Sequence, residues 1–255
     1  MCGIAGFIST TPQEEQIIHR VMTAIESRGG HAWGWATPNN WYKSTGKVPT
    51  ITSQLHLPND NPQIMIMHTR WATHGNSNDV NCAHPFVSGK WAIVHNGIVD
   101  NEHQAQKTKC DSEAILKLLI EKDDIKAVAE QLIGMFRIAI INKETGHLII
   151  VNDSSPVWFG KRFNSEIWFA SESKQLPTDC WMKEGKSNTI TELWIEDKNI
   201  KSKTEHFNKK TKYYTPDFAH IPQHPAVQKG WYNFSACRDC DERTCYKCPL
   251  VNGNQ

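Results

Sequence analysis

The chain has 255 residues, a formal net charge of +1, and 22% charged and 39% hydrophobic residues. This near-neutral balance argues against nucleic acid or an anionic membrane as the main partner, and the composition is that of a globular protein. No apolar run approaches the roughly 18 residues of a membrane span, and the N-terminus lacks the pattern of a signal peptide. We therefore expect a cytoplasmic protein.

Hydrophobic periodicity and turn residues predict secondary structure along the chain. The predicted elements, in chain order, are a strand over 3–8, a helix from Pro12 to Ser27, a strand over 31–36, a hairpin within 37–62, a strand over 63–68, a strand over 91–94, a helix capped by Asp111 or Ser112, a helix over 124–133, a hairpin of strands 136–142 and 147–152, and strands over 157–160, 166–170 and 189–195.

Strands come in hairpin-linked groups and helices in two clusters, without the alternation of a parallel sheet. This arrangement favours an α+β fold with largely antiparallel sheets covered by helices. From about residue 199 the sequence turns polar and basic and then proline-bearing, which is typical of a linker. We predict one domain over residues 1–215, and a linker with a small cysteine-rich tail over 216–255.

Cys2 follows the initiator methionine and opens the first predicted strand. If Met1 is removed, Cys2 carries a thiol and a free α-amine, so one residue can supply both a nucleophile and its base. A chain that retains Met1 would then be a precursor, since its Cys2 nitrogen is an amide. The alternative is a small buried residue in an edge strand, which these residues alone favour.

Other residues could complete an amide-hydrolysing site. Asn96 and Gly97 offer a side-chain amide and an unhindered backbone N–H for an oxyanion, although a tight turn is the alternative reading. Arg70 can bind a carboxylate through two hydrogen bonds, and Asp111 can pair with an ammonium group. Together these charges suit the two ends of a free amino acid, but Asp111 also fits a plain helix cap and Arg70 an ordinary ion pair.

Several motifs occur in one order that resembles a known family. They are CGIAG at 2–6, RG at 28–29, HTRWATHG at 68–75, AHP at 83–85, HNGIVDN at 95–101, DSEAI at 111–115 and FASE at 169–172. Over residues 1–200 the set resembles the class II glutamine amidotransferase domain, an N-terminal-nucleophile hydrolase. Within that family it is most similar to the glucosamine-6-phosphate synthase branch.

The resemblance implies a four-layer αββα sandwich and a glutaminase site. In that site Cys2 would be the nucleophile, and Asn96 and Gly97 the oxyanion hole. The implied glutamine-binding residues are Arg28, Arg70, Trp71, Thr73, His74 and Asp111. His84 is a weaker carry-over that reads equally well as a structural hydrogen-bonding residue. No cofactor is implied for the glutaminase chemistry.

Two departures from the family limit what carries over. The segment 30–35 differs from the family's Tyr-Asp-Ser-Ala-Gly type, and the residues after 200 leave no room for a synthase domain. We therefore expect a glutaminase that passes ammonia to a separate synthase or ligase. A catalytically weak binding module that docks through its tail is the alternative, and an N-terminal-cysteine hydrolase with another substrate is a third reading.

Four of the eight cysteines form two C-x2-C pairs in the tail, at Cys237, Cys240, Cys245 and Cys248. Two such pairs can supply four thiolates to one structural zinc ion, which would replace a core that so short a segment cannot build. An iron–sulfur cluster is the second reading and disulfides are the third.

Overall fold

The computed structural model describes residues 2–60, 62–72, 77–99, 108, 110–153, 157–163 and 165–209. The tail cysteines, the predicted boundary at residue 215, Thr73 and His74 lie outside these residues, so the predictions made for them stay predictions. Within the described ranges, no helix is long and apolar enough to cross a membrane.

Thirteen strands among the described residues form two antiparallel sheets. The first sheet has seven strands in the order β11-β9-β10-β1-β4-β2-β3. Its strands are β1 (Gly3–Ser9), β2 (Ala32–Ala36), β3 (Trp41–Thr45), β4 (Ile64–Arg70), β9 (Trp158–Arg162), β10 (Glu166–Ala170) and β11 (Trp181–Glu184). The second sheet has six strands in the order β13-β12-β8-β7-β6-β5. Its strands are β5 (Phe86–Ser88), β6 (Trp91–Val99), β7 (Gly134–Asn142), β8 (His147–Asn152), β12 (Thr189–Glu196) and β13 (Asn199–His206).

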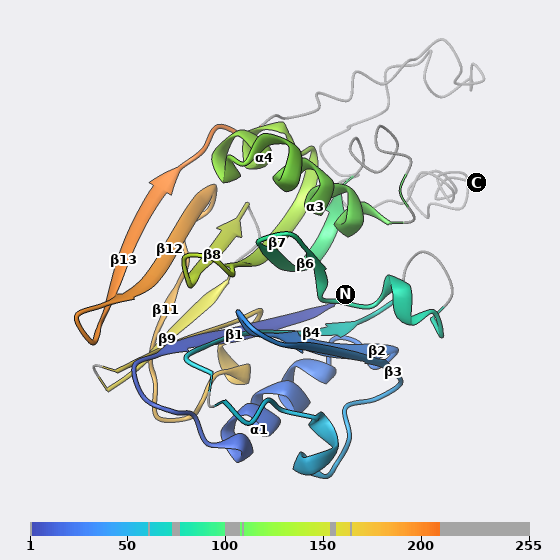
Figure 1. Ribbon diagram of the computed structural model, residues 1–255, viewed down its shortest axis with the longest axis vertical. Coiled ribbons are helices and arrows are strands. Elements are labelled where there is room, and N and C mark those ends of the chain that lie inside the picture. Colours follow the sequence, from blue (N-terminus) through green and yellow to red (C-terminus); the bar gives the residue numbers. More distant parts are fainter. Residues whose placement is uncertain are drawn as a thin grey trace, which may run out of the picture. The chain divides into compact units, whose positions relative to one another are not determined.

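Helices cover the outer faces of the two sheets (Figure 1). Helix α1 (Glu15–Glu26) packs its apolar face on the first sheet, whereas α3 (Asp111–Lys122) and α4 (Ile125–Gln131) pack on the second. Three short 3-10 helices, η1 (Thr52–Leu55), η2 (Val80–Cys82) and η3 (Ser173–Gln175), lie in connections. This arrangement confirms the predicted α+β fold and its αββα layering.

The two sheets meet in an apolar layer that becomes polar toward one end. Alternate residues of a strand point to opposite faces, and the layer between the sheets contains Ile4 and Ile8 of β1, Val94 of β6 and Ala139 of β7. The same alternation places Asn96 and Arg137 on this inner face, one step beyond the apolar residues. Cys2 precedes Ile4 by two residues and lies at the same end.

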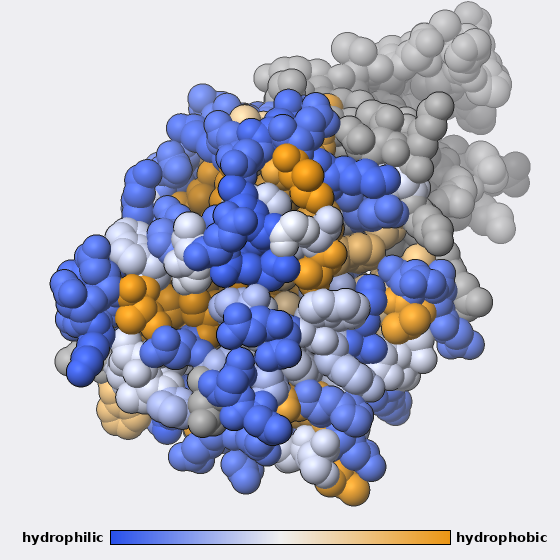
Figure 2. All heavy atoms as spheres, viewed as in Figure 1, coloured by the Kyte–Doolittle hydropathy of each residue, from blue (hydrophilic) through white to orange (hydrophobic). Residues whose placement is uncertain are grey.

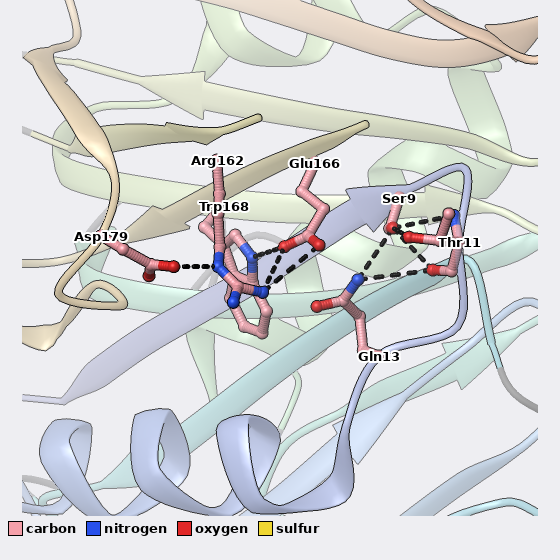
Figure 3. A network of polar contacts seen from close by, with 7 residues as sticks. All are labelled: Ser9, Thr11, Gln13, Arg162, Glu166, Trp168 and Asp179. Atoms are coloured by element: carbon pink, nitrogen blue, oxygen red, sulfur yellow. Dashed lines mark hydrogen bonds and ion pairs between the residues drawn. The ribbon is translucent and has the colours of Figure 1, made fainter. Parts of the chain in front are cut away.

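The opposite end of β1 carries a different polar cluster (Figure 3). There the Ser9 hydroxyl donates to the Thr11 carbonyl (2.6 Å) and accepts from Gln13 Nε2 (2.8 Å). Nearby, Arg162 contacts the Glu166 carboxylate, which also accepts from the Trp168 indole N–H (3.1 Å). Ser9 and Glu166 are paired in register, so the two groups join β1 to β10.

Several sequence predictions need correction. In place of the hairpin expected within 37–62, the described residues of this range contain β3, which pairs with β2, and the 3-10 helix η1. Pro12 lies outside α1, whose N-cap is Glu14. Residues from 199 form β13 before any linker, because a strand at the sheet edge exposes most of its side chains and therefore tolerates the polar composition that suggested a linker. Strands β5 and β11 were also not predicted, since both are short and largely exposed.

The surface shows no single dominant apolar face in the view of Figure 2. Hydrophilic residues predominate there, and hydrophobic residues form several separate patches. Isolated exposed apolar residues are normal for a globular domain and need no partner to explain them.

Candidate active site

Cys2 lies directly before β1, where its thiol contacts the backbone of Trp71. Trp71 N–H donates to Cys2 Sγ (3.4 Å), and Cys2 Sγ lies 3.7 Å from the Trp71 carbonyl oxygen. Gly3 permits this position, because a Cβ there would lie 2.5 Å from the Ile25 carbonyl oxygen. The cysteine is therefore held at the junction of β1, the end of α1 and the end of β4.

Arg28 anchors the backbone of Cys2. Its Nε donates to the Cys2 carbonyl oxygen (2.8 Å), and its Nη1 pairs with Glu172. Gly29 brings this loop against the Arg70–Trp71 peptide, since a Cβ at Gly29 would lie 2.4 Å from Trp71 N. The structure thus shows Arg28 supporting the candidate nucleophile, while the predicted contact with glutamine stays a prediction.

Glu172 has a role in the site that the sequence reasoning missed. It ends the FASE motif and orients Arg28, and it also pairs with Lys174 (2.9 Å). Lys174 and then Arg28 hold the pKa of Glu172 below its usual range. The motif was a usable signal, but the side chain's partner lies 144 positions away in the sequence.

Asn96 and Gly97 lie within β6, not in the turn that was one reading of their sequence. They pair with Arg137 and Phe136 of β7. Asn96 is only 4% exposed, and its Nδ2 has no hydrogen-bond partner. Gly97 has φ +152°, and a Cβ there would lie 1.9 Å from the Met135 carbonyl oxygen, so this strand requires glycine. An unused amide donor beside a glycine is the arrangement that an oxyanion hole needs.

Arg70 and Trp71 follow one another at the end of β4. Arg70 is buried, whereas Trp71 is 50% exposed. The backbone of this segment is held by His31, which sequence reasoning placed only in a strand. His31 N–H donates to the Arg70 carbonyl oxygen (3.0 Å), and Ala72 N–H donates to His31 Nδ1 (2.9 Å). The His31 and Trp71 rings also lie 4.8 Å apart.

His31, within the segment 30–35 that departs from the family pattern, thus supports the backbone of residues 70–72. No sequence pattern indicated it, because the contact depends on how β2 and β4 pair.

Asp111 is the first residue of α3. The N-cap of this helix is Cys110, and not Asp111 or Ser112 as predicted. Its Oδ2 accepts from Val99 N–H (3.2 Å) and its Oδ1 from Ser112 N–H (2.8 Å), and its side chain stays 24% exposed. His95 Nδ1 lies 3.8 Å from the carboxylate. Burial lowers the pKa of His95, with a smaller opposing effect from Asp111, so His95 is neutral near pH 7 and leaves the Asp111 charge for another cation.

His84 is part of a buried hydrogen-bonding cluster beneath Asp111. Its Nε2 lies 2.9 Å from Ser112 Oγ, which is also 3.0 Å from His95 Nδ1. The His68 and His84 rings lie 3.9 Å apart, and burial lowers the pKa of His68 to about 3. These contacts favour the structural reading of His84.

No group of three potential metal ligands occurs among the residues that the structure describes. The four tail cysteines lie beyond residue 209, so this finding does not bear on the predicted zinc site.

Comparison with known proteins points to one family. The glutamine amidotransferase domain family matches residues 56–232. The glutamine–fructose-6-phosphate aminotransferase of Francisella tularensis is 32% identical over 202 residues, covering 69% of this chain and 33% of the relative. The corresponding enzyme of Campylobacter jejuni is 27% identical over 203 residues, covering 71% of this chain and 34% of the relative. The chain thus spans about a third of the length of these curated relatives.

Solved structures share the fold. The glutamine phosphoribosylpyrophosphate amidotransferase of B. subtilis superposes with a TM-score of 0.62 at 20% identity, covering 79% of this chain and 49% of that chain. A class-II glutamine aminotransferase domain protein of Silicibacter pomeroyi gives 0.51 at 17% identity, covering 82% of this chain and all of the other. Since the family match covers more than half of the sequence, the chain belongs to the glutamine amidotransferase family and contains a class II domain of the N-terminal-nucleophile type.

Proposed function

We propose that this domain hydrolyses the side-chain amide of glutamine to glutamate and ammonia, with Cys2 as nucleophile. The observation that carries the proposal is the unpartnered Nδ2 of Asn96 at the same polar end of the sheet sandwich as the Cys2 thiol. Family membership supports glutamine as the substrate. Arg70 would bind its α-carboxylate and Asp111 its α-amino group, with Trp71, Thr73 and His74 lining the pocket.

The thiol needs a base in this environment. Burial raises the pKa of the Cys2 thiol, while the Trp71 backbone hydrogen bond and the charge of Arg70 oppose that effect. A thiol with a raised pKa is protonated near neutral pH and reacts slowly. Removal of Met1 would supply the base, since the free α-amine of Cys2 can take the thiol proton.

The reaction then has two stages. The thiolate attacks the amide carbon, and Asn96 Nδ2 with Gly97 N–H stabilises the resulting oxyanion. The α-ammonium returns a proton to the leaving nitrogen, so ammonia departs and a glutamyl thioester remains. Water adds to the thioester with the amine again acting as base, and cleavage of the C–S bond releases glutamate and restores the thiol.

We also propose that the ammonia reaches an acceptor on a separate synthase or ligase. The support is that the matched relatives are named glutamine–fructose-6-phosphate aminotransferases, and that the region shared with this chain is only about a third of their length. Partner identity can be tested by affinity purification of the chain from its source cells, followed by assays for ammonia-dependent activity in the captured protein. Full activity of the chain with a small acceptor, without a second protein, would overturn this part.

For the tail we propose structural zinc bound by Cys237, Cys240, Cys245 and Cys248. Elemental analysis of purified protein should give about one zinc per chain, and Cys237→Ser should lose it while glutamine hydrolysis continues. Iron with a visible absorption band would indicate an iron–sulfur cluster instead. Metal-free protein with these thiols intact would overturn both metal readings.

The main experiment joins an assay to a mass measurement. Purified protein is incubated with glutamine, released glutamate and ammonia are quantified, and intact mass reports whether Met1 is present. We expect stoichiometric glutamate and ammonia from protein that lacks Met1, and none from protein that retains it. Protein lacking Met1 that releases no glutamate, with or without a captured partner, would contradict the proposal and favour a binding module.

A further inference from the structure

Arg137 is a buried cation beside the candidate oxyanion hole. It lies in β7 directly opposite Asn96 of β6 and is only 8% exposed. Opposed side chains of an antiparallel pair lie on one face, with Cβ atoms about 5 Å apart. Asn96 lies two residues after the inner-face position Val94, and Arg137 lies two residues before the inner-face position Ala139, so both side chains leave their strands toward the inner face.

The row of side chains that includes Arg137 has unused hydrogen-bonding capacity. Arg137 Nε has no partner, and neither does Asn96 Nδ2 on one side or Asn152 Oδ1 on the other. Asn152 of β8 pairs with Arg137 in register, so the three residues form one continuous row across β6, β7 and β8. Buried polar atoms are normally satisfied, and a cluster that is not satisfied calls for an explanation.

The neighbouring carboxylates are already matched by other cations. Glu172 pairs with Arg28, and Asp153 pairs with Lys209 (2.7 Å). Among the described residues, Arg137 itself forms none of the ion pairs found in the structure. Burial and then the positive charge of Arg28 lower the pKa of Arg137, against smaller opposing effects of Asp153 and Glu172. Even so, a guanidinium stays charged at neutral pH. Arg137 is thus a buried positive charge that forms an ion pair with no carboxylate among the described residues.

We infer that Arg137 stabilises the negative charge that develops on the substrate amide oxygen, acting beside Asn96 and Gly97. This inference rests on the proposed glutamine hydrolysis. The ground-state amide is neutral and gains little from a nearby cation, whereas the tetrahedral oxyanion carries a full charge beside the buried Asn96 and Arg137 side chains. Arg137 forms no bond to substrate in this account and transfers no proton. It acts through the electric field of its guanidinium charge.

Three variants test the inference. Arg137→Met keeps length and removes charge, Arg137→Lys keeps charge, and Arg162→Met removes a paired arginine near the other end of β1 as a matched control. We expect Arg137→Met to lower kcat about 10- to 100-fold with KM within about twofold, because only the transition state loses stabilisation. Arg137→Lys should recover part of kcat, and Arg162→Met should leave kcat unchanged.

Thermal unfolding separates this role from a structural one. Removing an unmatched buried charge relieves its desolvation cost, so Arg137→Met should unfold at the same temperature as wild type or higher. Arg162→Met should lower Tm by about 3 °C, since it breaks a partnered network. An Arg137→Met protein with full kcat, or one whose lower kcat accompanies a lower Tm, would overturn the inference.

A binding measurement distinguishes failure of the inference from failure of the proposed function. Glutamate γ-semialdehyde can form a tetrahedral adduct with the Cys2 thiol, whereas glutamate cannot. Arg137→Met should weaken binding of the aldehyde about tenfold and leave glutamate binding unchanged. Equal loss of both ligands would contradict the role of Arg137, while wild-type protein that binds neither ligand and hydrolyses no glutamine would refute the glutaminase proposal itself.

Discussion

The two ends of β1 carry polar clusters that differ in how their buried charges are paired, although each contains a side-chain atom without a hydrogen-bond partner, Gln13 Oε1 at one end and Asn96 Nδ2 at the other. Near Ser9, Arg162 pairs with Glu166 and with Asp179 (2.5 Å), and the hydrogen bond to Asp179 raises the pKa of Arg162. Near Cys2, burial lowers the pKa of Arg137, whose Nε has no partner. Ion-paired charges stabilise a fold, while unpaired donors and charges next to a candidate nucleophile are available to a substrate.

The comparison therefore separates a stabilising end from a reactive end of one strand. A change near Ser9 should alter the free energy of unfolding and leave the chemistry alone. A change near Cys2 should alter the rate of the reaction and leave the free energy of unfolding unchanged, except where it breaks an ion pair such as Arg28–Glu172.

The largest expected effect follows replacement of the nucleophile. Cys2→Ser should reduce glutamine hydrolysis by about 10⁴-fold or more, because a weakly acidic hydroxyl replaces the thiol in the same position. Glutamate release measured against Cys180→Ser provides the control, since Cys180 lies beside Gly160 on the far part of the sheet. Residual activity of Cys2→Ser within tenfold of wild type would show that another residue attacks the amide.

Asp111→Asn should come next, with kcat/KM for glutamine lowered about 100-fold through loss of a charged contact to the α-amino group. Glutaramate, which is glutamine without that amino group, supplies the control substrate. Its kcat/KM should be the same in Asp111→Asn and wild-type protein. An equal drop for both substrates would mean that Asp111 acts only by joining α3 to β6.

At the other end of β1, Ser9→Ala should lower the free energy of unfolding by about 1–3 kcal/mol, because Thr11 N–H and Gln13 Nε2 lose a buried acceptor. Denaturant unfolding measures the change, and Ser44→Ala, at a half-exposed hydroxyl, should shift it by less than about 0.5 kcal/mol. Turnover of glutamine by Ser9→Ala should match wild type. A stable but slow Ser9→Ala protein would contradict the separation of the two ends.

The smallest effect concerns Glu172, whose ion pair with Arg28 contributes both to stability and to the position of Cys2. Lys174 and then Arg28 lower its folded pKa. Its contribution to stability is therefore full above its unfolded pKa of about 4.3 and is lost as the pH falls through the lower folded value. The free energy of unfolding of the wild-type protein should exceed that of Glu172→Gln by about 1 kcal/mol near neutral pH.

That difference should close as the pH drops below about 4, as measured by denaturant unfolding across pH. A difference that stays constant from neutral to acidic pH would exclude the ion pairs of Glu172 as its source. At neutral pH, Glu172→Gln should also slow glutamine hydrolysis slightly, since Arg28 would hold the Cys2 carbonyl less firmly.

Much of the fold was predictable, because its strands carry strong local patterns. The run before Arg70 and the hairpin at residues 136–152 were placed nearly to the residue, since both combine β-branched or apolar residues with clear boundaries. The exposed edge strands β11 and β13 escaped, because their stability depends on pairing with a neighbour rather than on burial of their own side chains.

The candidate site was predictable where residue type implied chemistry. Hydrogen-bond donors, charges and motif order led to five residues, which the structure places at one end of the sandwich: Cys2, Arg70, Asn96, Gly97 and Asp111. His31, Glu172 and Arg137 were not named as site residues. Each acts through a partner far away in sequence, so the charge or ring alone carried no signal.

The sequence by itself determined the family, the α+β class and the chemical groups of the site, because motifs and hydrophobic periodicity are local properties of the chain. Only the tertiary structure decided which of those groups are satisfied and which are left open. The pairing of β6 with β7 puts Arg137 beside Asn96, and the pairing of β1 with β10 brings Glu166, with its partner Arg162, beside Ser9. Whether a buried charge stabilises the fold or is available to a substrate depends on its neighbours, and those neighbours are set by strand register.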